Sequence, residues 1–265
     1  MKRIHTIRVM LILFFSMIIN IAISQKTYIN SSGDTLNQFD SLHQKTGLWK
    51  LERGMVYESG IFKNNKKEGV WIAYGVSGKP ELVEEYTSGV LNGVRLVFDE
   101  NGIIRNESHF VNNKLDGLNI YYLPNGVIQY KHSYKKGLLQ GDVYNYYENG
   151  ALLEQSFYWE GLKDSLSVYY FETGQIKVQI NFNKGQLNGT YTSYFNNGII
   201  KREKQYVQNL AQGKYFEYHE NSRIKLDGNY IDDKKTGKWI YYDFNGNTIK
   251  TEIYKNDILQ KTKIN

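Results

Sequence analysis

The sequence predicts an all-β fold: an elongated, twisted antiparallel β-meander built from tandem 24-residue β-hairpin repeats. Three observations predict it. From Gly69 the chain divides into eight consecutive 24-residue segments without an insertion or a deletion. Glycine and Asn-Gly recur at fixed places and interrupt the chain about every dozen residues, which excludes long helices. Between these breaks, apolar and aromatic residues alternate with polar ones, and a period of two is typical of strands.

The repeats are numbered from position 1, the glycine that opens most of them, to position 24. They start at Gly69, Gly93, Gly117, Gly141, Ser165, Gly189, Gly213 and Gly237. A shorter repeat starts at Gly47, and Ser32-Gly33 in the preceding segment marks one more turn. We therefore expect a signal peptide at 1–24, a degenerate N-terminal leader at 25–46 and a repeat array over 47–265.

Each repeat reads as one β-hairpin. In the first strand, Leu118, Ile120 and Tyr122 illustrate the alternation at positions 2, 4 and 6, and positions 12 and 18 share one parity in the second strand. Asn-Gly at positions 9 and 10 predicts a type I turn with a left-handed glycine. One extra residue at this glycine, a G1 bulge, brings position 6 opposite position 12, and we expect it in most repeats. A second turn at positions 20–24 leads into the next repeat.

Two positions are aromatic in all eight repeats, and we expect both to form continuous ladders in the core. Position 6 holds Tyr74, Phe98, Tyr122, Tyr146, Tyr170, Tyr194, Tyr218 and Tyr242. Position 18 holds Tyr86, Phe110, Tyr134, Tyr158, Phe182, Tyr206, Tyr230 and Tyr254. A property shared by every repeat is explained more simply by the fold than by a single binding event. Each ring can bury on the order of 150–250 Å².

The face opposite these ladders, at positions 3 and 5, carries a broken row of aromatic residues among polar ones. We interpret them as exposed, and as the candidate partner-binding residues Trp71, Tyr121, Tyr169, Tyr191, Tyr215, Trp239 and Tyr241. A row of exposed aromatics suits contact with a protein or a glycan. The alternative stays open, since sheet faces favour aromatic residues and some remain partly exposed without binding anything.

Tyr147 joins these candidates for a different reason. It lies in the stretch YNYYENG, where Tyr144 and Tyr146 have core parity and Asn149-Gly150 is the repeated turn. Position 7, which Tyr147 occupies, has no common residue type among the repeats. We therefore expect Tyr147 to have no structural duty and to be available to a partner.

The N-terminus predicts export. Lys2, Arg3 and Arg8 precede an apolar stretch at 10–23, and Ala22-Ile23-Ser24 places small residues where a signal peptidase cleaves. The alternative is an uncleaved N-terminal anchor. The chain has no cysteine, which excludes disulfides, thiolate metal sites and a thiol nucleophile. Export without disulfides favours a bacterial protein of the periplasm, the outer envelope or the medium.

Few residues point to chemistry. Without residues 1–24 the chain has 30 basic and 27 acidic residues, a net charge of about +3 with no basic cluster, which argues against nucleic-acid binding. His43, His109, His132 and His219 occupy different repeat positions, so we interpret them as solvated strand or turn residues. No catalytic fingerprint, metal motif or cofactor motif occurs in the sequence. We expect no enzyme activity, no metal and no cofactor.

The repeats GVWIAYGVSGKPELVEEYTSG and GKWIYYDFNGNTIKTEIYKND resemble the bacterial MORN-repeat variant family. The resemblance covers about residues 47–260 and implies a non-catalytic scaffold that binds proteins, with lipid association in some members. Many members carry the label toxin–antitoxin system antitoxin component, which fits poorly with an exported chain. Tryptophan at position 3 survives only in Trp49, Trp71 and Trp239, so the middle repeats depart from the family pattern.

We therefore expect an exported, non-catalytic scaffold for a protein partner in the cell envelope. The alternatives are an envelope glycan-binding module that uses the exposed aromatics, and an antitoxin-like inhibitor of a toxin. Choline- and glucan-binding repeats are also rich in glycine and aromatics, but tryptophan dominates their ligand boxes and this chain has only four tryptophans. Association with a membrane surface and homodimers formed by pairing of terminal strands are further expectations.

Overall fold

The computed structural model describes residues 36–265, so the expected signal peptide and the Ser32-Gly33 turn lie outside the described residues. The described part of the chain holds twenty strands and no helix, which confirms the all-β antiparallel meander. Within these residues, nothing combines helical structure with the length and hydrophobicity needed to cross a membrane.

The chain divides into two compact units, one up to Val90 and one from Leu91. In the N-terminal unit each strand pairs antiparallel with the next. Its strands are β1 (Gln38–Phe39), β2 (Lys45–Arg53), β3 (Val56–Lys63), β4 (Lys66–Tyr74) and β5 (Pro80–Thr87).

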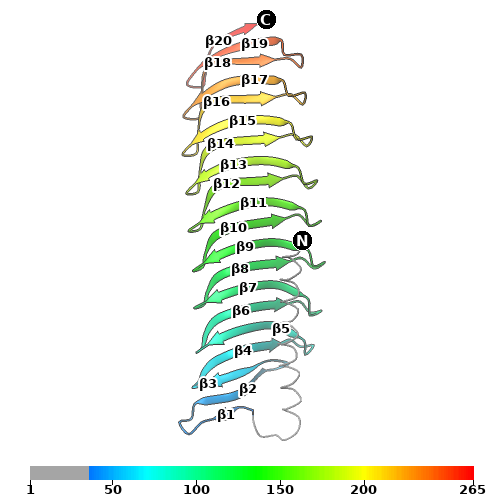
Figure 1. Ribbon diagram of the computed structural model, residues 1–265, viewed down its shortest axis with the longest axis vertical. Helices are drawn as coiled ribbons and strands as arrows, with labels where there is room; N and C mark the ends of the chain where they lie inside the picture. Colours follow the sequence, from blue (N-terminus) through cyan, green and yellow to red (C-terminus); the bar gives the residue numbers. More distant parts are fainter. Residues whose placement is uncertain (1–35) are drawn as a thin grey trace, which may run out of the picture. The chain divides into compact units, whose positions relative to one another are not determined.

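The C-terminal unit is also an antiparallel meander, from β6 to β20, and its strands lie side by side in sequence order (Figure 1). Its strands are β6 (Val90–Phe98), β7 (Ile104–Val111), β8 (Lys114–Tyr122), β9 (Ile128–Lys135), β10 (Leu138–Tyr146), β11 (Leu152–Trp159), β12 (Leu162–Tyr170), β13 (Ile176–Asn183), β14 (Gln186–Tyr194), β15 (Ile200–Val207), β16 (Leu210–Tyr218), β17 (Ile224–Ile231), β18 (Lys234–Tyr242), β19 (Thr248–Lys255) and β20 (Ile258–Ile264).

The predicted bulge at the Asn-Gly turn is confirmed. Between β10 and β11, the Gly150 N–H donates to the Tyr147 carbonyl at 2.9 Å, and the Tyr147 N–H donates to the Ala151 carbonyl at 2.8 Å. Gly150 has a φ of 85°, the left-handed conformation of a G1 bulge. The same two bonds recur in all eight repeats. The Asn149 side chain completes the turn by accepting the Ala151 N–H at 2.9 Å.

The second turn is a two-residue type I′ turn at positions 20 and 21. Glu160 and Gly161 both have positive φ, 49° and 83°, and connect the paired residues Trp159 and Leu162. The Gly161 N–H also donates to the carbonyl of Leu139, in the preceding repeat, at 2.8 Å. Because every such turn is bonded to the one before it, an insertion or deletion in one repeat would break these bonds. This bonding accounts for the constant repeat length.

An unpaired residue in the second strand changes which residues share a face. Asn145 pairs with Glu154, whereas Tyr146 pairs with Leu152, so Leu153 at position 13 has no partner across the β10–β11 ladder. The same skip occurs in all eight repeats. One extra residue reverses the alternation of side chains. Positions 14, 16 and 18 therefore lie with positions 3 and 5 on one face, the inner face, and positions 4, 6 and 15 lie on the other, the outer face.

The expectation that both aromatic columns share one face is therefore wrong. The position 18 column belongs to the inner face and pairs with position 1, as Tyr158 does with Gly141. The position 6 column belongs to the outer face, where the Tyr218 hydroxyl donates to Glu203 at position 15 of the preceding repeat, at 2.7 Å. Both columns are half-buried, apart from the buried ring of Phe98.

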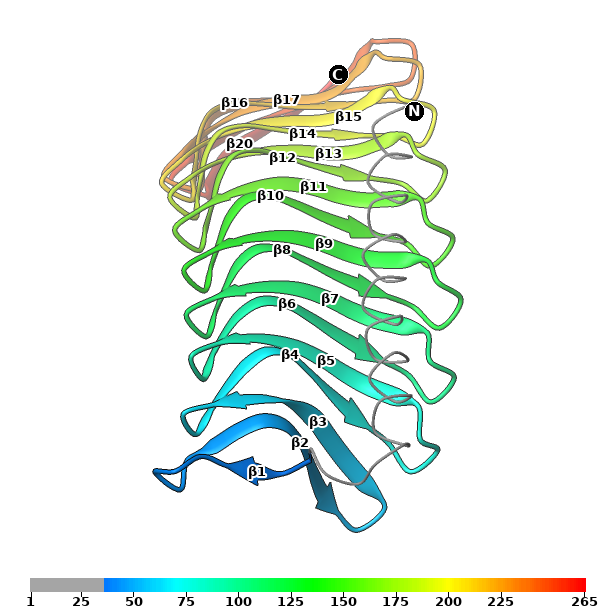
Figure 2. The same cartoon turned by 60° about the horizontal axis from the view of Figure 1, so that its bottom comes forward.

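The most buried column is position 3 on the inner face. Trp71 is 2 % exposed, Trp239 1 % and Ser167 0 %. Strands of the C-terminal unit bend along their length (Figure 2), so the sheet shelters one of its faces. The described residues add no second layer, and position 3 is covered by neighbours on its own face.

Candidate binding face

The inner face carries an aromatic cluster in each compact unit. In the N-terminal unit the ring of Phe62 lies 5.6 Å from Trp49 and 4.8 Å from Trp71, both edge-to-face. In the C-terminal unit the ring of Trp239 lies 5.0 Å from Tyr230 and 5.4 Å from Tyr215. Edge-to-face pairs of this kind add about 0.5–1.5 kcal/mol each beyond burial of their area. These clusters form the core of the repeats that contain tryptophan.

Lysine at position 23 lies over the aromatic rings of the following repeat. The Nζ of Lys67 is 4.3 Å from the ring centre of Trp71, and the Nζ of Lys235 is 4.5 Å from that of Trp239. A cation over a ring face is attracted by the ring quadrupole, by about 0.5–1 kcal/mol at exposed sites. The ammonium groups thus cover the aromatic clusters on the inner face.

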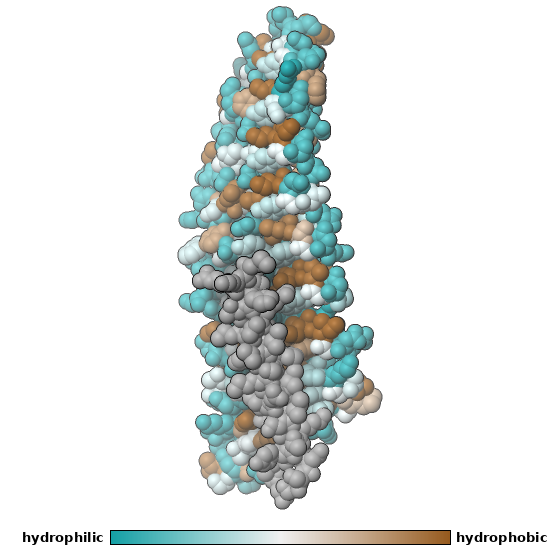
Figure 3. All heavy atoms as spheres, turned by 45° about the vertical axis from the view of Figure 1, so that its right-hand side comes forward, coloured by the Kyte–Doolittle hydropathy of each residue, from teal (hydrophilic) through white to brown (hydrophobic). Residues whose placement is uncertain are grey.

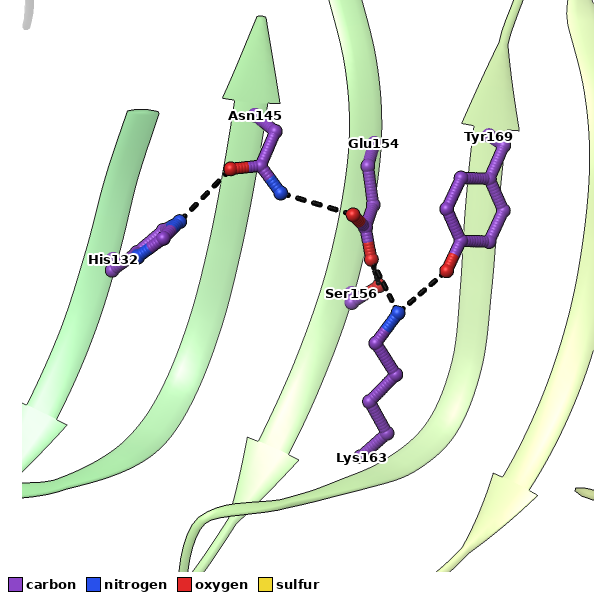
Figure 4. Close-up of polar contacts among 6 residues, drawn as sticks. All are labelled: His132, Asn145, Glu154, Ser156, Lys163 and Tyr169. Carbon is purple, nitrogen blue, oxygen red and sulfur yellow. Dashed lines mark hydrogen bonds and ion pairs between the residues drawn. The ribbon is translucent and has the colours of Figure 1, made fainter. Parts of the chain in front are cut away.

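The middle of the C-terminal unit has a polar network on the face where its last repeat has Trp239. Position 3 is small there, with Val143 in β10 and Ser167 in β12, both buried. Above them, six side chains from β9 to β12 are hydrogen-bonded in one line (Figure 4): His132, Asn145, Glu154, Ser156, Lys163 and Tyr169. We call these six residues the inner network.

Glu154 is the centre of the inner network. Its Oε1 accepts from the Nζ of Lys163 and from the hydroxyl of Ser156, both at 2.6 Å. Its Oε2 accepts from the Nδ2 of Asn145 at 2.9 Å. The Oδ1 of Asn145 lies 2.9 Å from the Nε2 of His132, and an amide oxygen can only accept, so His132 donates from Nε2. The Nζ of Lys163 also donates to the Tyr169 hydroxyl at 2.5 Å.

The charges of Glu154 and Lys163 stabilise each other. Burial by itself would raise the pKa of Glu154, but hydrogen bonds from Lys163 and Ser156 outweigh it and lower that pKa below its ordinary value. Burial by itself would lower the pKa of Lys163, but hydrogen bonds to Glu154 and Tyr169 raise that pKa instead. Both groups are therefore charged near neutral pH, and the network presents an ordered ion pair with no net charge.

A stack of rings extends the inner network towards β8. Tyr121 lies parallel to Tyr130 with ring centres 5.5 Å apart, and Tyr130 lies over His132 at 4.4 Å. All three side chains are half-buried. The stack and the network together form one continuous strip of aromatic and hydrogen-bonding side chains from β8 to β12.

The structure corrects part of the predicted contact set. Trp71, Tyr215 and Trp239 are buried, so the expectation that they are exposed is wrong. The reason is the skip at position 13, which places positions 16 and 18 beside position 3. The half-buried members lie on the inner face at positions 3 and 5: Tyr121, Tyr169, Tyr191 and Tyr241. Tyr121 and Tyr169 belong to the strip, whereas Tyr241 donates to Glu252 at 2.7 Å in the C-terminal aromatic region.

Tyr147 also differs from its interpretation. Its hydroxyl donates to the Tyr170 carbonyl, in the next repeat, at 2.8 Å. His219 occupies the same position, and its Nε2 lies 3.1 Å from the Tyr242 carbonyl. Both side chains thus form a hydrogen bond with the backbone of the last residue in the first strand of the next repeat. The expectation that Tyr147 has no structural duty is wrong.

The sequence interpretation missed five members of the inner network: His132, Asn145, Glu154, Ser156 and Lys163. Glu154 at position 14, and His132 and Ser156 at position 16, share a face with position 3 only because of the skip at position 13. One signal in the sequence could have revealed it, because Gly60 and Gly228 each stand eleven residues before a tryptophan at position 3. An ideal Cβ on Gly60 would lie 2.4 Å from the Trp71 ring, so position 16 lies beneath position 3 of the next repeat.

Among the residues that the structure describes, no group of three or more histidine, aspartate or glutamate side chains could hold a metal ion.

The sequence profile of the MORN repeat variant matches six segments of the chain: 91–112, 115–136, 139–160, 163–184, 187–208 and 235–256. The chain belongs to the MORN repeat variant family. Each matched segment starts at position 23 and spans both strands of one hairpin, in phase with the observed register. Residues 211–232 are unmatched, yet β16 and β17 pair in the register of the other MORN repeats.

A comparison with curated proteins finds no match. Among solved structures, a mutant of the Photorhabdus luminescens Tc holotoxin pore is similar at 10 % sequence identity, with a TM-score of 0.18. The match covers 86 % of this chain, which spans only about 15 % of that chain's length. A likeness at this TM-score carries no argument about function.

Proposed function

We propose that the protein is a non-catalytic scaffold that binds a protein partner through the inner-face strip between β8 and β12. One observation carries the proposal. In the repeats that form the strip, a hydrogen-bonded and half-buried set of side chains takes the place of the buried tryptophan that the repeats starting at Gly69 and Gly237 have at position 3. Membership of a MORN repeat family agrees with a binding role.

The strip has the properties of a contact surface. Its turns and backbone bonds are those of every repeat, whereas the side chains of the inner network occur together only here. The bonds among Asn145, Glu154 and Lys163 fix these side chains before a partner arrives, which lowers the entropy cost of binding. Tyrosine, which lies beside these groups, is common among the residues that contribute most of the binding energy in protein interfaces.

A protein partner is favoured over a glycan by the orientation of the rings. Sugar rings stack on exposed aromatic faces. Here Tyr130 lies between Tyr121 and His132, so the ring faces are turned towards one another. The strip therefore offers ring edges and polar groups, which suit the side chains and backbone of a protein. Glycan binding remains the second candidate because Asn145, Glu154 and Lys163 could also hydrogen-bond hydroxyl groups.

Export to the cell envelope belongs to the same proposal. Its support is the sequence of residues 1–24, with basic residues, an apolar stretch and small residues in the order of a signal peptide. Cell fractionation with N-terminal sequencing tests it. We expect a chain that starts near residue 25 outside the cytoplasm, and a full-length cytoplasmic chain would contradict export.

Capture from envelope extracts tests the binding function. We expect one partner to be recovered with the wild-type chain and lost with Tyr121→Ala and Asn145→Ala. Leu118→Ala is the matched control, since Leu118 lies on the same strand as Tyr121 but on the outer face and is exposed. A glycan array probed with the same variants is the counter-test. Saturable sugar binding lost with Tyr121→Ala, with no protein recovered, would replace the protein partner by a glycan.

A further inference from the structure

The type I′ turns line up along one edge of the C-terminal unit (Figure 1), and a single file of outer-face residues runs beside them. Each of the fourteen strands from β7 to β20 contributes one residue, at position 19 or position 22. In order, the file reads Val111, Lys114, Lys135, Leu138, Trp159, Leu162, Asn183, Gln186, Val207, Leu210, Ile231, Lys234, Lys255 and Ile258. We call these residues the edge row.

The apolar members of the edge row are exposed. Val111, Leu138, Trp159, Leu162, Val207, Leu210, Ile231 and Ile258 are between 43 % and 66 % exposed. The edge with the Asn-Gly turns differs: where that side comes forward in Figure 3, hydrophobic side chains form separate spots among hydrophilic residues. The row contains two exposed apolar runs, Leu138 with Trp159 and Leu162, and Val207 with Leu210 and Ile231. Exposed apolar patches of this kind indicate an interaction surface.

The order of residues in the edge row is a palindrome. Apolar and polar residues follow the same sequence from either end, and the centre falls between Asn183 and Gln186. Rotation about a two-fold axis through this centre reverses the row. Leu162 of one copy then meets Val207 of the other, and Trp159 meets Leu210. A surface that matches its own rotated copy is the requirement for an isologous dimer.

We propose that the edge row is a homodimer interface with its two-fold axis between β13 and β14. The molecule that binds the edge row is a second copy of this chain, because binding an unrelated partner would not require the residues of the row to follow a palindromic order. Strands lie about 4.8 Å apart, so fourteen strands span roughly 60 Å. With a width of about 10 Å, the row covers on the order of 600 Å² per copy, near the ~800 Å² of a standard interface.

The axis brings like charges together inside the row, Lys114 with Lys255 and Lys135 with Lys234, whereas the turns beside the row carry opposite charges. Lys135 and Lys136 outnumber Asp116, which accepts from the Lys135 Nζ at 2.9 Å, so this end is basic. The two-fold axis places it against the turn of Asp232 and Asp233, where these outnumber Lys234 and the charge is acidic. Sheet twist makes the two rows diverge away from the axis, so the central apolar residues carry most of the contact.

The oligomeric state in solution tests the dimer. Sedimentation of the purified chain over a concentration series is expected to show a dimer. Leu162→Glu and Leu210→Glu put charges next to the axis and are expected to give monomers with unchanged circular dichroism. Ile103→Glu is the control, since Ile103 is similarly exposed, at 46 %, but lies at an Asn-Gly turn. A monomeric wild-type chain, or a dimer that persists in both variants, would overturn the proposal.

Cross-linking tests the position of the axis independently of affinity. The chain has no cysteine, so each substitution introduces its only thiol. Asn183→Cys lies at the axis and is expected to couple to its own copy with a short bismaleimide. Val111→Cys is expected not to couple to itself, because the two copies of residue 111 lie about 60 Å apart. Trp159→Cys is expected to couple to Leu210→Cys in mixed dimers, because these two positions face each other near the axis. Self-coupling through residue 111 would exclude this two-fold arrangement.

Discussion

The indole of Trp239 occupies the space above the backbone of Gly228: an ideal Cβ at residue 228 would lie 2.4 Å from the indole Cδ2. Gly228 has ordinary negative φ, so its lack of a side chain serves packing alone. We expect Gly228→Ala to lower the free energy of unfolding by about 1–3 kcal/mol, because the buried ring must move. Urea denaturation followed by tryptophan fluorescence measures the change.

A double-mutant cycle controls for other effects of the methyl group. In a Trp239→Leu background, Gly228→Ala is expected to cost much less, because the clash is gone. Equal costs in both backgrounds would show that the Trp239–Gly228 contact is not responsible.

Ser165 has the left-handed conformation, with a φ of 62°, at the position where seven other repeats have glycine. A non-glycine residue there carries a backbone cost on the order of 1–3 kcal/mol. Ser165→Gly is therefore expected to raise the free energy of unfolding by about 1 kcal/mol. Ser133→Gly, on an extended strand, is the control and is expected to lower it by about 0.5–1 kcal/mol. A destabilised Ser165→Gly variant would contradict the strain at residue 165.

Tyr147 bonds two neighbouring repeats through its hydroxyl group. Tyr147→Phe removes this bond, and phenylalanine already occupies the same position at Phe171 and Phe195. We expect the fold to be kept and the free energy of unfolding to fall by about 0.5–1.5 kcal/mol. Thermal unfolding with reversible refolding measures it. An unchanged stability would mean that the Tyr147 hydroxyl bond contributes nothing.

The Glu154–Lys163 pair makes stability depend on pH. The folded-state pKa of Glu154 is lowered from 4.5, so its contribution is present above pH 4.5 and is lost as the pH falls through the folded pKa. The folded-state pKa of Lys163 is raised from 10.5, so its contribution is present below pH 10.5 and is lost as the pH rises through the folded pKa. We therefore expect wild-type stability to fall more steeply on acidification than that of Glu154→Gln.

Denaturant midpoints at pH 7 and below pH 4 measure the difference. At pH 7, Glu154→Gln is expected to be less stable by roughly 1–2 kcal/mol, since half-buried Lys163 loses its charged partner. Glu52→Gln is the control, because Glu52 pairs with Lys50 at an exposed site, where such a pair contributes little. Parallel acid profiles for the wild type and Glu154→Gln would contradict the lowered pKa.

Much of the fold was predictable from the sequence. Asn-Gly at Asn149-Gly150 and its counterparts gave the turn, the bulge and the pairing of position 6 with position 12, because glycine marks a backbone with positive φ. The skip at position 13 was not predictable in this way. Residues such as Leu153 carry no glycine or proline there, so nothing in their type marks the break in alternation.

The candidate site was predictable only where an aromatic residue stood at position 3 or position 5. Tyr121 and Tyr169 were found through their position in the repeat. His132, Asn145 and Glu154 are ordinary polar residues in isolation, and only the three-dimensional register brings them together. The eleven-residue spacing of Gly228 and Trp239 indicates this register. A buried indole at position 3 leaves no room for a side chain at position 16 beneath it, so glycine is required there.

Tyrosine footprinting with the recovered partner tests the inner-face strip most directly. Oxidation of the full chain with and without the partner is expected to show protection of Tyr121, Tyr130 and Tyr169, while Tyr218 on the outer face reacts equally in both. Protection of Tyr218 with unchanged reactivity of Tyr121, Tyr130 and Tyr169 would contradict binding through the inner face.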